Sequence, residues 1–375
     1  MYGYSLIFLT ILIPFKINAQ TVSSGTLSNG QAQNIIQTGV PFLLIAPDSK
    51  SAAMGEVGAA TNPDANSIHW NASKLAFIEN QTGISLSYAP WLRSIVSDIN
   101  LSYLSAYHRL SDKNVIGGSL RYFSLGSIQL TDANGLSQGL YSPYELGVDF
   151  AFARMFSDNF SMGITARYIQ SSFSNGQFIN GQQLQAATGF AADLSAYYKN
   201  PITLFNKTAE LAFGMSISNI GPKISYSANG TRYSLPTNLK LGGATSIDID
   251  ADSKLILALD MNKLLVPVTA NNNPNSSVVS SIFGSFSDGS NQLRDISYSL
   301  GAEYLLKQQF ALRLGYFYED PTLGNRQYFT TGAGFRYQSF GLDVAYVLAD
   351  PQKNPLGRTL RFTISFNFGA TDKRS

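Results

Sequence analysis

The residues that could support catalysis or metal binding are few in this chain. Its histidines are His69 and His108, and it has no cysteine, which excludes thiolate chemistry, disulfide bonds and a histidine-rich metal site. A hydrolase would need a serine activated by a histidine, and His108, beside Arg109, is the candidate for that role. No EF-hand or P-loop spacing occurs. We therefore expect no catalytic residues, no metal ligands, no cofactor and no enzymatic activity.

One acidic cluster offers oxygen ligands. Asp248, Asp250 and Asp252 alternate through a short connection, and carboxylates at this spacing could hold Ca²⁺ weakly. The same residue types are typical of a solvated hairpin turn, because their side chains accept hydrogen bonds from nearby backbone N–H groups. We favour the turn.

Other charged side chains follow a period of two residues. Between residues 82 and 368 the chain divides into fourteen segments in which apolar and polar positions alternate, and the charges lie almost entirely at the polar positions. In segment 360–368, for example, Arg361, Thr363 and Ser365 alternate with apolar residues. Successive side chains of a strand point to opposite faces, so each segment has one apolar face and one polar face.

The polar faces carry charges of both signs. A ring of one sign would indicate an ion-selective pore, whereas mixed signs predict ion pairs inside a narrow or plugged interior. Glycine and alanine at other polar positions leave room for a packed segment, for which residues 40–77 are the candidate. The expected inward charges are Arg121, Asp149, Arg167, Asp193, Glu210, Lys240, Asp260, Glu303, Arg313, Arg336, Asp343 and Arg361.

The connections support a closed barrel. After the second segment they alternate between short and long, as in outer-membrane barrels, which have short periplasmic turns and long outer loops. This pattern places both chain ends in the periplasm. The predicted strands are 84–88, 99–107, 116–122, 146–152, 162–168, 190–198, 211–217, 239–249, 255–261, 296–306, 310–318, 329–337, 342–348 and 360–368.

Composition agrees with a membrane barrel. Of 375 residues 13% are charged, about half the usual share of soluble proteins, and the net charge of +2 indicates no nucleic-acid partner. A soluble β-sandwich would show the same alternation. The nearly charge-free apolar faces, the alternating loop lengths and the aromatic residues near segment ends favour lipid outside. We predict an all-β fold, a 14-stranded antiparallel transmembrane β-barrel with an N-terminal hatch or plug segment.

The N-terminus is typical of a secretory signal. Residues 5–15 form an apolar run too short to span a bilayer as a helix, and it ends at Ala19 before Gln20. A buried N-terminal strand is the alternative, since no basic residue precedes the run. We predict a signal peptide at 1–19, an N-terminal extension and hatch at 20–80, a barrel at 81–368 and a periplasmic tail at 369–375. Asp64 is the expected N-cap of a short helix that carries Ile68 and Trp70.

The block 45–71 carries the most specific signal in the chain. It resembles the start of the PorV family, outer-membrane proteins of the type IX secretion system, and more distantly the hatch of FadL-like fatty-acid transporters. Asn71-Ala72-Ser73 stands where the family has Asn-Pro-Ala, and the chain ends in a polar tail rather than at Phe368. The hatch motif comprises Met54, Gly55, Gly58, Asp64, Asn66, Trp70 and Asn71.

The resemblance implies a non-enzymatic role in the bacterial cell outer membrane. PorV-like proteins accompany the giant translocon barrel, bind the C-terminal domain of secreted cargo and pass it to the surface attachment complex. The implied partners are these three and outer-membrane lipid. The alternative is a FadL-like transporter of hydrophobic small molecules, whose lumen should hold a continuous apolar pocket. A purely structural barrel is a third possibility.

The longest connection, 262–295, contains two apolar stretches. Exposed apolar loop residues often mark a surface that binds a partner, although these stretches could equally extend the flanking strands and pack on each other. The candidate partner-binding residues are Leu265, Val266, Val268, Val279, Ile282 and Phe283.

Overall fold

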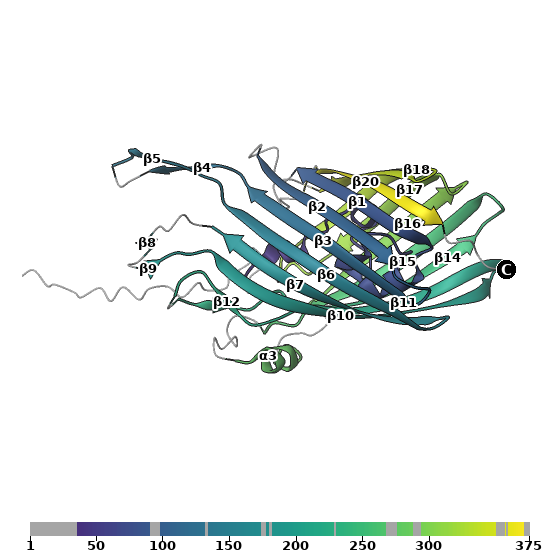
Figure 1. The fold of residues 1–375 in the computed structure, drawn as a ribbon, viewed down its shortest axis with the longest axis horizontal. Coiled ribbons are helices and arrows are strands. Elements are labelled where there is room, and N and C mark those ends of the chain that lie inside the picture. The colour runs from purple at the N-terminus through teal and green to yellow at the C-terminus, as the bar shows by residue number, and fades with distance from the viewer. Residues whose placement is uncertain are drawn as a thin grey trace, which may run out of the picture.

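Fourteen strands close into an antiparallel barrel in the computed structural model (Figure 1). The structure describes residues 36–90, 98–131, 134–173, 178–179, 182–228, 230–267, 276–287, 294–349, 357 and 359–370. Each barrel strand pairs with the next in sequence, and the first pairs with the last. The barrel strands are β1 (Asn80–Pro90), β2 (Ile99–Arg109), β3 (Asn114–Leu125), β6 (Tyr144–Ser157), β7 (Phe160–Ser172), β10 (Ala187–Leu204), β11 (Lys207–Ile220), β14 (Asn238–Asp248), β15 (Ser253–Leu264), β16 (Ile296–Leu306), β17 (Phe310–Tyr318), β18 (Gln327–Tyr337), β19 (Phe340–Leu348) and β20 (Leu360–Ala370).

All fourteen predicted strands are confirmed, and several extend beyond the predicted apolar segments. Strand β10 has 18 residues, because backbone pairing continues into polar sequence where the strand leaves the apolar band. The long connections hold three small hairpins that the sequence did not predict, β4–β5 (Ile128–Thr131 and Ser137–Tyr141), β8–β9 (Phe178–Ile179 and Gln182–Gln183) and β12–β13 (Ile224–Ser225 and Arg232–Tyr233). They also hold the helix α3 (Val278–Gly284).

The barrel wall exposes its apolar face and buries its charges. On β17, Leu312 and Leu314 are each 65% exposed, whereas Arg313 between them is 3% exposed. The same alternation appears in the other barrel strands, for example on β20, where Phe362 and Ile364 are exposed and Arg361 is buried. The predicted direction of the two faces is therefore confirmed.

The helices are short and lie mostly in the plug. None of the helices in the described ranges is long and apolar enough to cross a membrane.

The plug, residues 40–78, fills the interior of the barrel (Figure 1, purple). It contains η1 (Pro41–Leu44), α1 (Ser49–Ala53), α2 (Ser67–Trp70) and η2 (Ala72–Phe77), and nearly all of its residues are buried. The prediction that this segment lies inside the barrel is confirmed. Because the plug elements are too short to be stable alone, their contacts with the wall must hold them in place.

The predicted N-cap of the plug helix is wrong. Helix α2 begins at Ser67 and its N-cap is Asn66. Asp64 instead forms a turn before the helix, because its carboxylate accepts a hydrogen bond from the Asn66 backbone and its own N–H donates to the Ser67 hydroxyl. A second helix, α1, begins after Asp48, whose carboxylate accepts from the Ser51 N–H, and this cap was not predicted.

The plug crosses the barrel from one end to the other. At its start, the Gly39 N–H donates to the Ser234 carbonyl in a long connection at 2.9 Å, and Phe42 packs against Leu101 and Phe123 near the long loops. At its end, the Arg109 guanidinium beside a short turn donates to the Ile78 carbonyl. The first and last strands do start and finish at the short-turn end, as predicted. The described chain begins at residue 36 and passes Gly39 at the opposite, long-loop end. The predicted position of the N-terminus itself depends on residues 1–35, which lie outside the described residues.

Glycines let the plug backbone touch the wall backbone. A Cβ atom on Gly214 of β11 would lie 1.9 Å from the Ala59 carbonyl oxygen, and one on Gly315 of β17 would lie 2.0 Å from the Gly55 nitrogen. Gly55 itself has a φ of +68°, which non-glycine residues adopt at a cost. No larger residue fits at these positions without moving the plug.

We expect Gly214→Ala to destabilise the protein, because the added methyl group meets plug backbone that cannot rotate away. Overpacking of this kind lowers the free energy of unfolding by roughly 1–3 kcal/mol. The matched control is Gly243→Ala on β14, where a Cβ would meet only Phe213 side-chain atoms at 3.7 Å and a carbonyl oxygen at 3.9 Å. Urea unfolding in detergent measures both variants, and equal stabilities would contradict the packing described.

The direction of the plug predicts which residues reach the cell surface. Gln37 lies exposed at the long-loop end, and Asp112 lies exposed in a short turn. The chain has no cysteine, so a single introduced cysteine is the one thiol that a maleimide can label. A membrane-impermeant maleimide added to intact cells should label Gln37→Cys and spare Asp112→Cys until the outer membrane is opened. The reverse pattern of labelling would overturn this orientation.

Candidate functional site

The residues with catalytic or metal-binding potential lie apart from each other. Within the described ranges, no three His, Asp or Glu residues are grouped closely enough to hold a metal ion. His108 lies on the outer face of the wall, where its Nδ1 is 2.8 Å from the Thr82 hydroxyl. His69 lies inside the plug. The structure therefore brings no serine to either histidine among the contacts it describes.

The acidic connection after β14 forms a hairpin turn. The Asp250 carboxylate accepts a hydrogen bond from the Asp252 N–H at 2.9 Å, and this bond lowers the pKa of Asp250. Asp248 is 3.1 Å from the Lys254 ammonium. The carboxylates are thus used by the turn and by a neighbouring lysine, as the turn interpretation predicted.

The inward charges of the wall form buried ion pairs. Arg167 on β7 bridges Asp149 and Asp193 at 2.6 and 3.0 Å. Arg313 on β17 bridges Glu303 and Asp343 at 2.5 and 2.7 Å. Each of these two groups spans three strands, so it neutralises the lumen and also links the wall. The predicted pairing of mixed charges is confirmed for these residues.

A second set of wall charges binds the plug backbone. The Asp260 carboxylate on β15 accepts hydrogen bonds from the Gly58 and Ala59 N–H groups at 2.7 and 2.9 Å. Arg121 on β3 donates to the Phe42 and Leu43 carbonyls at 3.2 and 2.8 Å. Arg361 on β20 donates to the Ala46 carbonyl. These are charge-assisted bonds in a buried setting, which are stronger than neutral ones.

Trp70 and Gly58 of the hatch motif form the centre of the plug. The Trp70 indole N–H donates to Asp48 at 2.6 Å, and its ring lies so close to Gly58 that a Cβ there would be 2.4 Å from it. The Lys240 ammonium, on wall strand β14, sits 4.9 Å from the centre of the Trp70 ring. The motif therefore requires glycine at position 58, because the Trp70 ring packs directly against the backbone there.

The asparagines of the motif tie plug segments together. The Asn71 amide donates to the Ala59 and Ala196 carbonyls at 2.9 and 3.0 Å, and its oxygen caps η2 by accepting from the Ser73 N–H. Asn66 accepts from the Ser105 hydroxyl of β2. Met54 packs in the apolar core between plug and wall. These motif residues hold the plug together or join it to the wall, and all seven motif positions are buried or partly buried.

Burial shifts the titration of the plug side chains. It lowers the pKa of Lys74 to about 8, and the Lys74 ammonium donates to the Gly58 carbonyl at 2.6 Å. Burial also raises the pKa of Asp48. For His69, burial and then the charges of Arg121, Arg167 and Lys240 lower the pKa well below its usual range. The His69 Nδ1 accepts a hydrogen bond from the Arg121 guanidinium at 2.5 Å.

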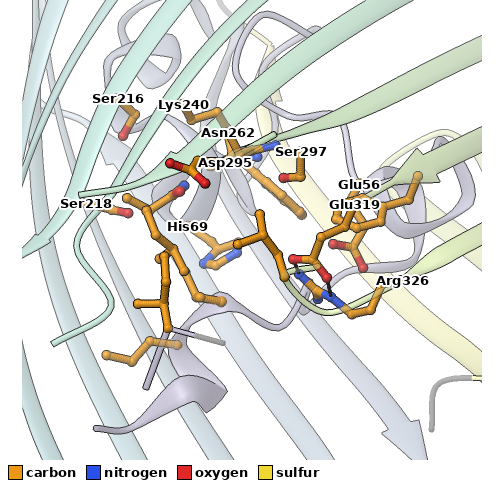
Figure 2. A pocket seen from close by; sticks show the side chains of 18 residues that line it. Glu56, His69, Ser216, Ser218, Lys240, Asn262, Asp295, Ser297, Glu319 and Arg326 are labelled. Carbon is orange, nitrogen blue, oxygen red and sulfur yellow. Dashed lines mark hydrogen bonds and ion pairs between the residues drawn. The ribbon is translucent and has the colours of Figure 1, made fainter. Parts of the chain in front are cut away.

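A cavity of about 160 Å³ lies between the plug and the long-loop end of the wall (Figure 2). The plug contributes Glu56 and His69, and the wall contributes Lys240 together with serine and asparagine side chains. Glu319 and Arg326, from the connection between β17 and β18, stand at its rim. Sequence reasoning did not single out Glu56. The available signal was that it is the one acidic residue in the glycine- and alanine-rich block 49–60.

The candidate partner-binding residues of the long connection divide into two groups. Leu265 and Val266 are buried, so for them the packing alternative holds. Val279 and Phe283 on α3 are 63% and 71% exposed, and Ile282 is partly buried. Val268 lies outside the described residues. Helix α3 stands outside the barrel wall (Figure 1), and Phe286, which was not predicted, extends its exposed apolar surface.

Solved structures share this fold at low sequence identity. The Pseudomonas putida toluene transporter TodX is 12% identical with a TM-score of 0.50, over 89% of this chain and 98% of that one. A deletion mutant of the TodX monoaromatic hydrocarbon channel is 12% identical with a TM-score of 0.52, over 86% and 99%. A Pseudomonas aeruginosa FadL homologue is 12% identical with a TM-score of 0.44, over 90% and 100%. No curated protein matches the chain.

Residues 28–271 match the family model of the type IX secretion system protein PorV. This region includes the plug, with its hatch motif, and the first nine of the fourteen barrel strands, β1 to β15. Because the match covers well over half of the chain, the protein belongs to the PorV family and is a bacterial outer-membrane component of the type IX secretion system.

Proposed function

We propose that this protein binds the C-terminal domain of secreted cargo at the translocon and passes it to the surface attachment complex, without catalysing a reaction. The single observation that carries the proposal is the filled lumen. The plug runs through the barrel and its backbone is bonded to Asp260, Arg121 and Arg361 of the wall. A protein of this kind works through its outer surface rather than as a channel.

The lumen also argues against transport of a hydrophobic molecule. Such a transporter should offer a continuous apolar pocket, but ion pairs and glycines interrupt the inward face of the described wall. Apolar inward residues such as Leu101 and Ile169 pack in one cluster with plug residues. Moving the plug aside would break several buried charge-assisted bonds at once, and leaving one buried partner unpaired costs about 3–5 kcal/mol. We therefore assign the plug, with its hatch motif, to sealing the barrel.

The exposed apolar side of α3 is the proposed contact surface for cargo or translocon. Val279, Phe283 and Phe286 are spaced by four and three residues and are all exposed. Ser277 caps the helix by accepting from the Ser280 N–H, and Ser281 is buried. A preformed helix that presents large apolar side chains outside the barrel is suited to protein recognition.

We also propose a signal peptide before the plug and a periplasmic tail after the last strand. A secreted barrel must reach the periplasm before it folds, which agrees with a signal peptide at 1–19. The polar residues after the last strand would form a short periplasmic tail.

We expect the double substitution Val279→Ser and Phe283→Ser to block cargo display. It removes the two most exposed apolar side chains of α3 while leaving the barrel wall unchanged. The matched control is Leu136→Ser with Leu140→Ser, because these leucines are equally exposed at the β4–β5 hairpin. Surface display of cargo and co-purification of the translocon barrel are the two measurements.

The α3 variant should reach the membrane at normal levels and lose both properties at least tenfold, while the control keeps them. Normal display by the α3 variant would reject this contact surface. Loss of cargo display in both the α3 variant and the control would reject the assignment of the contact surface to α3.

A further inference from the structure

The cavity at the long-loop end contains a carboxylate, Glu56, whose neighbouring cations are already paired with other carboxylates. Lys240 and Arg326 line the same cavity and attract Glu56, but their ion pairs are with Asp260 and Glu319. The other charges that line it are paired. Glu319 and Arg326 form two bonds of 2.9 Å, Asp295 is 3.3 Å from Lys263, and Lys240 is 3.7 Å from Asp260. Among the described residues, Glu56 forms no ion pair, and its bonding partner is the neutral Tyr328 hydroxyl at 2.8 Å.

Glu56 is held in this position by the plug. It is only 9% exposed, and its φ of +68° is a conformation that non-glycine residues rarely adopt. Strained residues of this kind persist where surrounding contacts fix them, and they are frequent at binding sites. Burying a carboxylate is unfavourable unless a cation balances it. The cations near Glu56 already balance Asp260 and Glu319, so the site gains from a ligand that brings one more positive charge.

The rest of the lining fits the stem of such a ligand. Leu43 and Leu44 of the plug and Leu264 of β15 provide apolar surface, and Asn262 and Ser297 provide uncharged polar groups. A cavity of about 150 Å³ holds a six-membered ring, so the volume of about 160 Å³ admits a short alkyl chain. The rim is accessible, since the Arg326 side chain is 36% exposed.

We propose that this cavity binds one alkyl cation, an ammonium or guanidinium group on a short methylene stem, with Glu56 as its counter-ion. Two sources carry this chemistry, a lysine or arginine side chain of a polypeptide and a free amine. The polypeptide source rests on the proposed function, because cargo would present its side chain from the outer side. The cavity would then recognise one basic residue of that partner.

Calorimetric titration of the purified full-length protein in detergent tests the site directly. The probes are pentylammonium, Nα-acetyl-lysine methylamide and uncharged pentanol. Pentylammonium should bind and pentanol should not. Binding of the lysine derivative as tightly as pentylammonium assigns a polypeptide source, and its exclusion assigns a free amine.

Glu56→Gln keeps the acceptor for Tyr328 and removes the charge, and it should weaken binding on the order of 10- to 100-fold. The matched control is Glu210→Gln at the opposite end of the barrel, which should leave binding unchanged. Ser297→Phe fills the cavity with Glu56 intact and should abolish binding. No binding by the native protein, or unchanged binding by Glu56→Gln or Ser297→Phe, would overturn the proposal. None of these titrations contains cargo, so their failure leaves the proposed function standing.

Discussion

The structure depends on the need to satisfy every polar backbone group of a segment enclosed in a barrel. The plug elements are short, and much of the plug is irregular, so the plug cannot satisfy its backbone internally as a long helix would. A buried N–H or carbonyl without a partner is costly. The wall supplies the partners through charged side chains at inward positions, such as Asp260 for two N–H groups and Arg121 for two carbonyls.

This constraint explains which inward residues are charged and which are small. Where the plug offers unpaired backbone groups, the wall places a long charged side chain. Where the plug backbone itself approaches, as at Gly214 and Gly315, the wall places glycine. Where neither applies, wall charges pair with each other across strands, as around Arg167. The result is a lumen filled by the plug, which is why we propose the outer mouth and its loops as the surface that meets partners.

The sequence predicted the barrel well because its signal is periodic. A strand period of two residues, repeated over fourteen segments, identifies strands, faces and connections without any knowledge of contacts. The position of the plug could be predicted, but its internal structure could not. Asp48 and Asn66 are helix N-caps and Asp64 is not, and this difference arises only from contacts that the fold creates. The cavity could not be predicted either. Glu56 becomes distinctive only when Lys240, Arg326 and Asp295 are seen to have partners elsewhere.

The central claim is that the plug stays in place while the protein works. The Thr363 hydroxyl of β20 donates to the Ser49 hydroxyl of α1 at 3.0 Å, so cysteines at these two positions can form a disulfide with little movement. The chain has no native cysteine, so the two introduced thiols can pair only with each other within one molecule. Cargo display should be measured for Ser49→Cys with Thr363→Cys, oxidised and reduced. The account predicts equal display in both states. Display that is lost on oxidation and regained on reduction would show that the plug must move.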